Sequence, residues 1–337
     1  MLRLAAGVEQ PTLTRSIRLA LLFVGLCLIA WLVWRADPHV VARMILRLGW
    51  RFGLVVIVYT CYVIVRAAAL QRTVIGVRPR FSDVLRIRLS AEAVEWLTFT
   101  GPFLSEPAQG WLLTERGVSP FAAFAAVVTE YLLYSASSSI LAIPAMALLL
   151  SRYAIGEMRT AAALIVLLMT TYLCALAFAS ISGIGLIAPS LRRLAVVFGR
   201  RAERAATQFE PIEHLVIVFL HERRRRLAEV MALEAAAQLV LILELWIIMA
   251  ALTLSRSLID AATIEGGVKF VAAVFVLVPG QVGASETVYA WLARAIGLSA
   301  AAGVSFALVR RLRGFVVAIA ALVVLAAEKG PRRAGSA

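Results

Sequence analysis

The stretch PFAAFAAVVTEYLLYSASSSILAIPAMALLL, residues 120–150, decides the fold class. It carries one charged side chain, Glu130, and it exceeds the roughly 20 residues that a helix needs to cross about 30 Å of hydrocarbon. Its polarity does not alternate from one residue to the next, as it would in the strands of a membrane barrel. The stretch therefore predicts a membrane-spanning helix.

Similar apolar runs recur along the whole chain. They cover residues 17–34, 50–70, 160–188, 227–254 and 299–327. The chain has 337 residues, of which 62% are hydrophobic and only 16% are charged, too few charges for the surface of a soluble domain of this length. The sequence therefore predicts an all-α polytopic membrane protein with about six full spans, forming a single integral membrane domain over residues 1–337.

The basic residues, which give the chain a net charge of +14, gather on one side of the predicted membrane. They occur before the first span, in the C-terminal tail, in the segment 190–226, and in a loop that contains Arg72, Arg78, Arg80, Arg86 and Arg88. By the positive-inside rule these regions are cytoplasmic. Both termini are therefore predicted to lie on the cytoplasmic side of a cell (plasma or inner) membrane. Anionic lipid, rather than nucleic acid, is then the expected partner of the arginines.

Two other apolar segments, residues 91–116 and 264–296, are interrupted by residues that break helices. The breaks are at Gly101-Pro102 and Glu106-Pro107 in the first segment and at Pro279-Gly280 and Gly283 in the second. Proline lacks a backbone N–H and disfavours the helical conformation in the residue before it. A break inside lipid leaves backbone groups unpaired, so it survives only where protein or a wet cavity covers it. We interpret the segments as broken or re-entrant hairpins around a cavity, with simple helix kinks as the alternative.

The two broken segments also resemble each other. Both contain the pattern S-E-x4-W-x5-G-[VL]-S, with Glu106 and Trp111 in the first copy and Glu286 and Trp291 in the second, each pair 180 residues apart. With the span that follows each copy, the repeat covers about residues 91–150 and 264–327. One copy follows a cytoplasmic loop and the other an outer loop, which predicts an inverted repeat. In transporters of this design the substrate site lies near the midplane, at the repeat interface.

Charged and polar residues inside the apolar segments are the candidates for the cavity lining. A charge near the bilayer centre costs at least about 2.5–3.5 kcal/mol, so it should face a cavity or a partner. Glu130 and Arg310 are again 180 residues apart, with opposite charge. We expect Arg310 or Arg311 to neutralise a glutamate; the alternative is a loop at residues 310–313. The predicted substrate-binding residues are Glu106, Glu130, Glu244, Glu286, Arg310, Arg311, Trp111, Trp291 and Gln281.

Several kinds of chemistry have no support in the sequence. The three histidines and three cysteines lack the spacing of metal ligands. No phosphate-binding G-x-x-x-x-G-K-[ST] loop is present, and no nucleophile motif stands out. We therefore expect no metal site, no cofactor, no ATP hydrolysis and no catalytic residue.

Two motifs carry a resemblance to a known family. Residues 101–116 with the turn at 117–119, and residues 278–286 (VPGQVGASE), are similar to the two motifs of the lysylphosphatidylglycerol synthase transmembrane (flippase-like) family. Arg310 and Glu244 match an arginine of its last span and an acidic position before its second motif. The resemblance covers about residues 15–328. The chain departs from the family at Gln281, which replaces a glycine, and at residues 103–105, which replace a glycine-rich stretch.

This resemblance implies translocation of a lipid or lipid-linked substrate, and not lysyl transfer. The chain resembles the stand-alone members that lack an aminoacyl-transferase domain. The expected partners are membrane lipids with an anionic or glycosylated headgroup. Two alternatives stay open: a non-catalytic membrane partner of lipid-synthesis enzymes, and an intramembrane lipid-modifying enzyme with a glutamate as general base.

Overall fold

The computed structural model describes residues 46–97, 102–152, 159–185, 187–190, 192, 199–252, 257–274 and 284–327. Helices account for nearly all of this part of the chain, and it contains no strand, which confirms the all-α class. The helices are α3 (Trp50–Thr73), α4 (Phe81–Leu97), α5 (Pro102–Thr114), α6 (Pro120–Arg152), α7 (Arg159–Ser182), α9 (Arg200–Glu222), α10 (Arg224–Ala251), α11 (Leu258–Val274), α12 (Ala284–Ala295) and α13 (Ala300–Ala327).

Four of the described helices are long and apolar enough to cross a membrane. These are α3, α6, α7 and α10, and they coincide with four of the predicted spans. The predicted span at residues 17–34 lies outside the described residues. The last predicted span is the continuous helix α13, whose central arginines lower its hydropathy. The number of six full spans stays a prediction.

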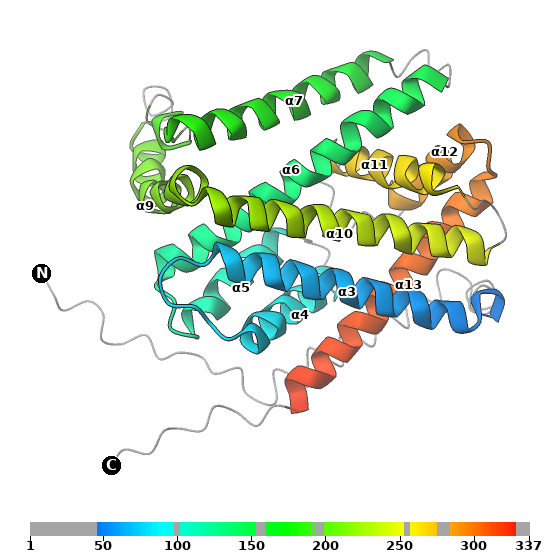
Figure 1. Cartoon of the computed structure of the whole chain (residues 1–337), viewed down its shortest axis with the longest axis horizontal. Coiled ribbons are helices and arrows are strands. Elements are labelled where there is room, and N and C mark those ends of the chain that lie inside the picture. Colours follow the sequence, from blue (N-terminus) through cyan, green and yellow to red (C-terminus); the bar gives the residue numbers. More distant parts are fainter. Residues whose placement is uncertain are drawn as a thin grey trace, which may run out of the picture.

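Two sets of four helices, α3–α6 and α10–α13, have the same order and equivalent neighbours. α4 packs on α13 as α11 packs on α6, α5 packs on α6 as α12 packs on α13, and α3 packs directly on α10. Figure 1 shows that α3 and α10 run in opposite directions, as do α6 and α13. The arrangement is that of an inverted repeat, and it includes α3 and α10, which lie outside the predicted copies.

α4 and α5 are separate helices, as are α11 and α12, and the predicted breaks at Gly101-Pro102 and Pro279-Gly280 fall between the members of each pair or at the first residue of α5. Pro102 is the first residue of α5, a position at which its missing N–H would have no helical partner in any case. The residues at the other predicted break positions, Gly101, Pro279, Gly280 and Gly283, lie outside the described residues, as does Gln281.

The second break predicted in the first segment is wrong. Pro107 lies inside α5, and the helix continues to Thr114. Proline removes one hydrogen bond and crowds the carbonyl four residues earlier, but this position is close to the start of the helix. Packing of α5 against α4 and α6 holds the remaining turns in place. A proline near a helix start therefore does not divide this short helix.

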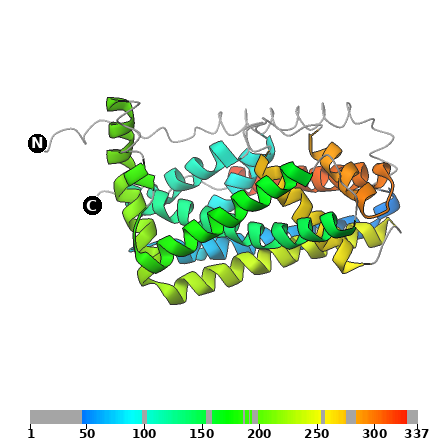
Figure 2. The same cartoon turned by 90° about the horizontal axis from the view of Figure 1, so that it is seen from above.

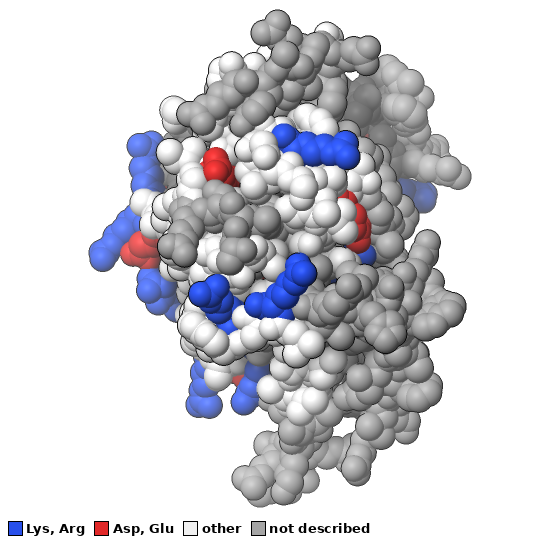
Figure 3. All heavy atoms as spheres, turned by 90° about the vertical axis from the view of Figure 1, so that its right-hand side faces the viewer, with Lys and Arg blue, Asp and Glu red and all other residues white. Residues whose placement is uncertain are grey.

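One end of the bundle is crossed by α9, as Figures 1 and 2 show. α9 lies within the predicted basic segment 190–226, and its apolar side chains, such as Phe219 and Leu220, pack onto the bundle. Exposed arginines surround this end, among them Arg72, Arg116 and Arg225. Figure 3 looks onto the opposite end, where most described atoms belong to uncharged residues and the basic side chains are spread out.

Gly303 lets α13 lie directly against α12. A Cβ atom at this position would be 2.2 Å from the carbonyl oxygen of Tyr289, and backbone cannot yield as a flexible side chain can. We expect Gly303→Ala to lower the free energy of unfolding by about 1–3 kcal/mol, the usual effect of overpacking. Thermal unfolding of the purified protein in detergent measures this. Gly53→Ala is the control, because nothing lies within 4 Å of that position in α3; equal stability of both variants would contradict the prediction.

Candidate functional site

Charged side chains collect in the interior of the helical bundle. Among the described residues, four arginines and five glutamates are buried: Arg66, Arg88, Arg310, Arg313, Glu92, Glu130, Glu234, Glu244 and Glu265. A buried charge without a partner costs several kcal/mol, so these side chains must be paired. Their ion pairs form two groups, one in each repeat.

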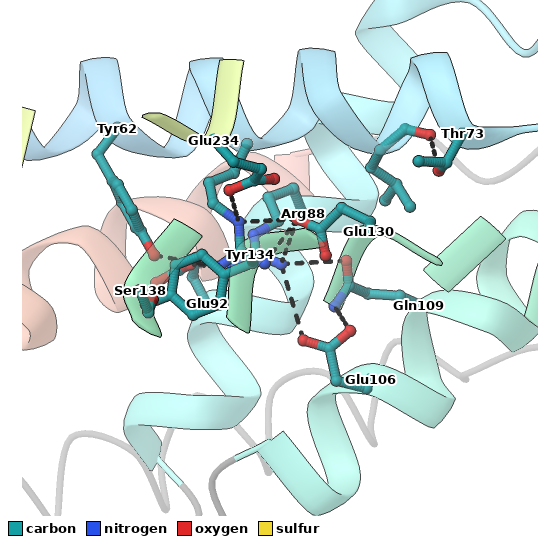
Figure 4. A network of polar contacts seen from close by, with 12 residues as sticks. Tyr62, Thr73, Arg88, Glu92, Glu106, Gln109, Glu130, Tyr134, Ser138 and Glu234 are labelled. Atoms are coloured by element: carbon teal, nitrogen blue, oxygen red, sulfur yellow. Dashed lines mark hydrogen bonds and ion pairs between the residues drawn. The ribbon is translucent and has the colours of Figure 1, made fainter. Parts of the chain in front are cut away.

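The first group centres on Glu130 of α6 (Figure 4). Its Oε1 accepts a hydrogen bond from Arg66 Nε of α3 at 2.7 Å and lies 2.5 Å from Arg66 Nη2. Arg88 Nη1 of α4 is 3.9 Å from the same oxygen, and Arg88 Nη2 pairs with Glu92 at 3.2 Å. The Glu130 carboxyl thus lies between an arginine of α3 and an arginine of α4.

Glu106 of α5 lies at the edge of this first group. Its Oε2 accepts a hydrogen bond from Gln109 Nε2 at 3.0 Å, and its Oε1 is 3.9 Å from Arg88 Nη1. The Glu106 side chain is 17% exposed, whereas that of Glu130 is fully buried. Glu106 therefore connects the buried charges to the surface of the molecule.

The second group centres on Arg310 of α13, the residue equivalent to Glu130. Its Nη1 lies 2.6 Å from Glu265 Oε2 of α11 and donates to the hydroxyl of Tyr289 at 2.6 Å. Its Nη2 lies 3.4 Å from Glu244 Oε2 of α10, and Arg313 binds the other oxygen of Glu244 at 2.5 Å. Arg310 thus lies between a glutamate of α10 and a glutamate of α11.

The central residues of the two groups, Glu130 and Arg310, occupy equivalent positions and carry opposite charges. In the first repeat, α6 supplies a glutamate to arginines on α3 and α4. In the second repeat, α13 supplies an arginine to glutamates on α10 and α11, the helices equivalent to α3 and α4. The packing of the helices is repeated, while the sign of each charge at the centre is reversed.

Two tyrosines join the groups into one network. The Tyr59 hydroxyl donates to Glu92 at 2.6 Å, and the guanidinium of Arg313 lies 3.5 Å from the centre of its ring. Tyr134 has Arg66 over its ring at 3.8 Å, and its hydroxyl accepts a hydrogen bond from Lys269 at 2.5 Å. Such cation–π contacts are strongest where water is excluded. The network therefore crosses the interface between the two repeats.

The structure brings four of the predicted site residues into this network: Glu106, Glu130, Glu244 and Arg310. Arg311 and Glu286 form a separate ion pair between α13 and α12, with side chains 17% and 19% exposed. Both arginines are thus paired with glutamates, as the sequence predicts. The alternative of a loop at residues 310–313 is wrong, because α13 is helical throughout.

The two predicted tryptophans lie elsewhere. Trp111 is 40% exposed on α5, and Trp291 packs against the apolar cluster between α10 and α13. Within the described part of the chain, the structure does not place either indole among the buried charges.

Six buried charged residues of the network are not among the predicted site residues: Arg66, Arg88, Glu92, Glu234, Glu265 and Arg313. The prediction that Arg88 belongs to a basic cytoplasmic loop is wrong, because α4 buries it with 2% exposure. A signal for Arg66 exists, since it is a charge in the interior of the apolar run 50–70. Glu92 and Glu265 lie beside shorter apolar stretches, where the signal is weaker.

Comparison with known proteins gives one match. The family described as the lysylphosphatidylglycerol synthase TM region matches residues 17–321. The chain belongs to this family. No curated protein and no solved structure matches it.

Membership of the lysylphosphatidylglycerol synthase TM family confirms the resemblance carried by the two motifs, and with the apolar helices it shows a multi-pass membrane protein. The family's name links the chain to lipid metabolism or transport. All residues of the buried network lie within the part of this chain that matches the family.

Proposed function

We propose that this protein moves a lipid, or a lipid-linked molecule, from one leaflet of the membrane to the other. The observation that carries the proposal is the buried ion-pair network across the repeat interface. Buried ion pairs add little stability compared with apolar packing, and inside membrane spans they mark substrate or ion pathways. In transporters with inverted repeats, the substrate site lies at such an interface.

The arginines of the network are the groups that would bind an anionic or glycosylated headgroup. A guanidinium binds phosphate through two parallel hydrogen bonds, and its N–H groups can also donate to sugar hydroxyls. In this structure Glu130 and Glu244 are fully buried, so the centres of both groups are inaccessible to a headgroup. A headgroup must therefore displace a carboxylate from an arginine, and this exchange would allow the two repeats to move apart.

The Arg311–Glu286 pair is the most accessible place for such an exchange to begin. Both side chains are partly exposed, and they lie on α13 and α12 beside the second helix break. Glu106, with similar exposure, occupies the equivalent position beside the first break. Because the repeats are inverted, one entrance would face each leaflet.

The end of the bundle that carries α9 would face the cytoplasm. Exposed arginines surround this end, and cytoplasmic loops carry an excess of Arg and Lys. Anionic lipids of the inner leaflet would bind the same arginines.

A second candidate function is that of a membrane partner for lipid-synthesis enzymes. α7 favours it, because only 11% of its apolar span is buried within the protein. Its exposed side chains include Leu164, Leu167, Leu168 and Phe178. Such a helix can pack against lipid or against a helix of another protein.

Reconstitution in liposomes tests the proposed function. We expect the wild-type protein to move fluorescent anionic lipids between leaflets faster than in empty liposomes. Glu286→Gln removes the charge that holds Arg311 and should lower the rate by about tenfold, as should Glu106→Gln at the other entrance. Glu210→Gln is the matched control, because Glu210 is 51% exposed on α9. Absence of lipid movement for every lipid tested, with stable capture of a lipid-synthesis enzyme, would favour the partner function.

A further inference from the structure

We propose that Glu130 and Glu234 form a proton-binding site, in which their two carboxyls share one proton beside Arg66. The site lies between α6 and α10, in contact with α3. As a source of energy for lipid movement this proposal rests on the proposed function, but the proton site itself does not.

The two carboxyls converge on one guanidinium nitrogen. Arg66 Nε donates to Glu130 Oε1 at 2.7 Å and lies 3.6 Å from Glu234 Oε2. Both glutamate side chains are 0% exposed, and each places an oxygen near the same Arg66 nitrogen. Two ionised carboxylates have only acceptor atoms and repel each other, so a hydrogen bond between them requires a proton on one.

Buried oxygens at this place have no donor. Glu130 Oε2, Glu234 Oε1 and Gln238 Oε1, one turn along α10, accept no hydrogen bond from the described residues. A buried carboxylate oxygen without a donor is costly. A proton on the pair would supply a donor to one of these oxygens.

The buried charges of the first group are negative by one. In the first group, Arg66 and Arg88 face three buried glutamates, Glu92, Glu130 and Glu234. In the second group, the buried Arg310 and Arg313 face two, Glu244 and Glu265. In the first group two buried arginines thus meet three buried glutamates, and one proton makes that group neutral. In the second group Lys269, 15% exposed and 3.7 Å from Glu265, adds a further positive charge.

The other helices around the pair do not supply the missing charge. α5 contributes the partly exposed Glu106, and α9 meets α10 through apolar side chains such as Val216 and Phe219. From α11, Lys269 is directed to Tyr134 and Glu265. The arginines of α13 bind their own glutamates, Glu244, Glu265 and Glu286.

The position of the pair links proton binding to movement of the repeats. Arg66 and Glu130 belong to the first repeat, whereas Glu234 belongs to the second. The residue equivalent to Glu234 in the first repeat is Leu54, so the second repeat has no counterpart of this pair. Loss of the proton places two negative charges together across the contact between α6 and α10, which favours separation of these helices. Proton release would therefore open the interface that the proton closes.

Infrared spectroscopy of the full-length protein in liposomes tests the site without any lipid substrate assay. We expect the wild-type protein at neutral pH to show the C=O band of a protonated, buried carboxyl. Glu234→Gln should remove the intensity of one such carboxyl, because Glu130 then stays ionised beside Arg66. Glu210→Gln should leave the band unchanged. An unchanged band in Glu234→Gln, or no band in the wild type, would overturn the proposal.

The same variant gives a second criterion. Glutamine is neutral and has the size of glutamic acid, so Glu234→Gln should fold and elute from a sizing column like the wild type. Failure of this variant to fold would also overturn a protonated Glu234, since a neutral side chain of the same shape would then be unable to replace it.

Transport distinguishes this proposal from the proposed function. With a pH difference across the liposome membrane, wild-type lipid movement should depend on the direction of the gradient, and Glu234→Gln should lose this dependence. If the infrared band is present but the protein moves no lipid, the proton site is supported and the proposed transport function is contradicted. If the wild type moves lipid but shows no such band, the transport function is supported and the proton site is contradicted.

Discussion

Arg66→Ala is expected to prevent the protein from accumulating in a folded form. The substitution leaves Glu130 and Glu234, both fully buried, without the guanidinium that they share. Removal of one member of a buried ion pair costs about 3–5 kcal/mol, because the remaining charge stays buried without a partner. This is a large part of a total stability of about 5–15 kcal/mol. The yield of monodisperse protein in detergent, and its unfolding temperature, measure the effect.

The same helix offers a control for this substitution. Arg72 also pairs with a glutamate, Glu229, but the two side chains are 45% and 34% exposed. Exposed ion pairs contribute about 0–1 kcal/mol, so Arg72→Ala should behave like the wild type. Adding Glu130→Gln to Arg66→Ala should restore part of the yield, since it removes one of the stranded charges. Equal yields of Arg66→Ala and Arg72→Ala would show that the buried network does not hold the fold.

Arg310→Glu is expected to be at least as damaging, although it makes the two repeats alike at this position. Glutamate is the residue that the first repeat has there, as Glu130. In the second repeat, however, the surrounding side chains are Glu244 and Glu265, at 3.4 Å and 2.6 Å from the Arg310 nitrogens. A third carboxylate in a buried position repels both. We expect no folded protein on a sizing column.

Two further variants show whether the sign of the charge is the cause. Arg294→Glu reverses an exposed charge on α12 and should leave the yield unchanged. Arg310→Gln removes the charge without reversing it and should give an intermediate yield. If Arg310→Glu folded as well as Arg310→Gln, the pairing in the second repeat would not depend on charge.

The sequence predicts the helices of this protein better than their contacts. Residues 120–150 specify a span on their own, because length and hydrophobicity suffice for a helix in lipid. The offset of 180 residues between Glu130 and Arg310 is enough to identify equivalent positions of opposite charge. These features depend on neighbouring or regularly spaced residues, so they can be recognised in a single sequence.

The partners of those charges could not be predicted in the same way. Glu130 binds Arg66, which lies 64 residues away along the chain, and Arg310 binds Glu265 through the packing of α11 and α13 with their neighbours. Such pairs depend on which helix faces lie together. Arg88 shows the difficulty, because arginines before and after it in the sequence are at the surface, while its position on α4 turns it inward. Pro107 likewise breaks helices in general, but its place near the start of α5 makes it tolerable here.

The reversal of charge between the repeats also bears on how the chain is made. Arg66, Arg88, Glu92 and Glu130 are all synthesised before α10, and they are neutral as a set. Glu244, Glu265, Arg310 and Arg313 are synthesised later, and they too are neutral together. Each half can therefore enter the membrane during translation with its charges already matched. Glu234 is the exception. It is synthesised with the second half, but the arginine beside it, Arg66, belongs to the first half, which is inserted earlier.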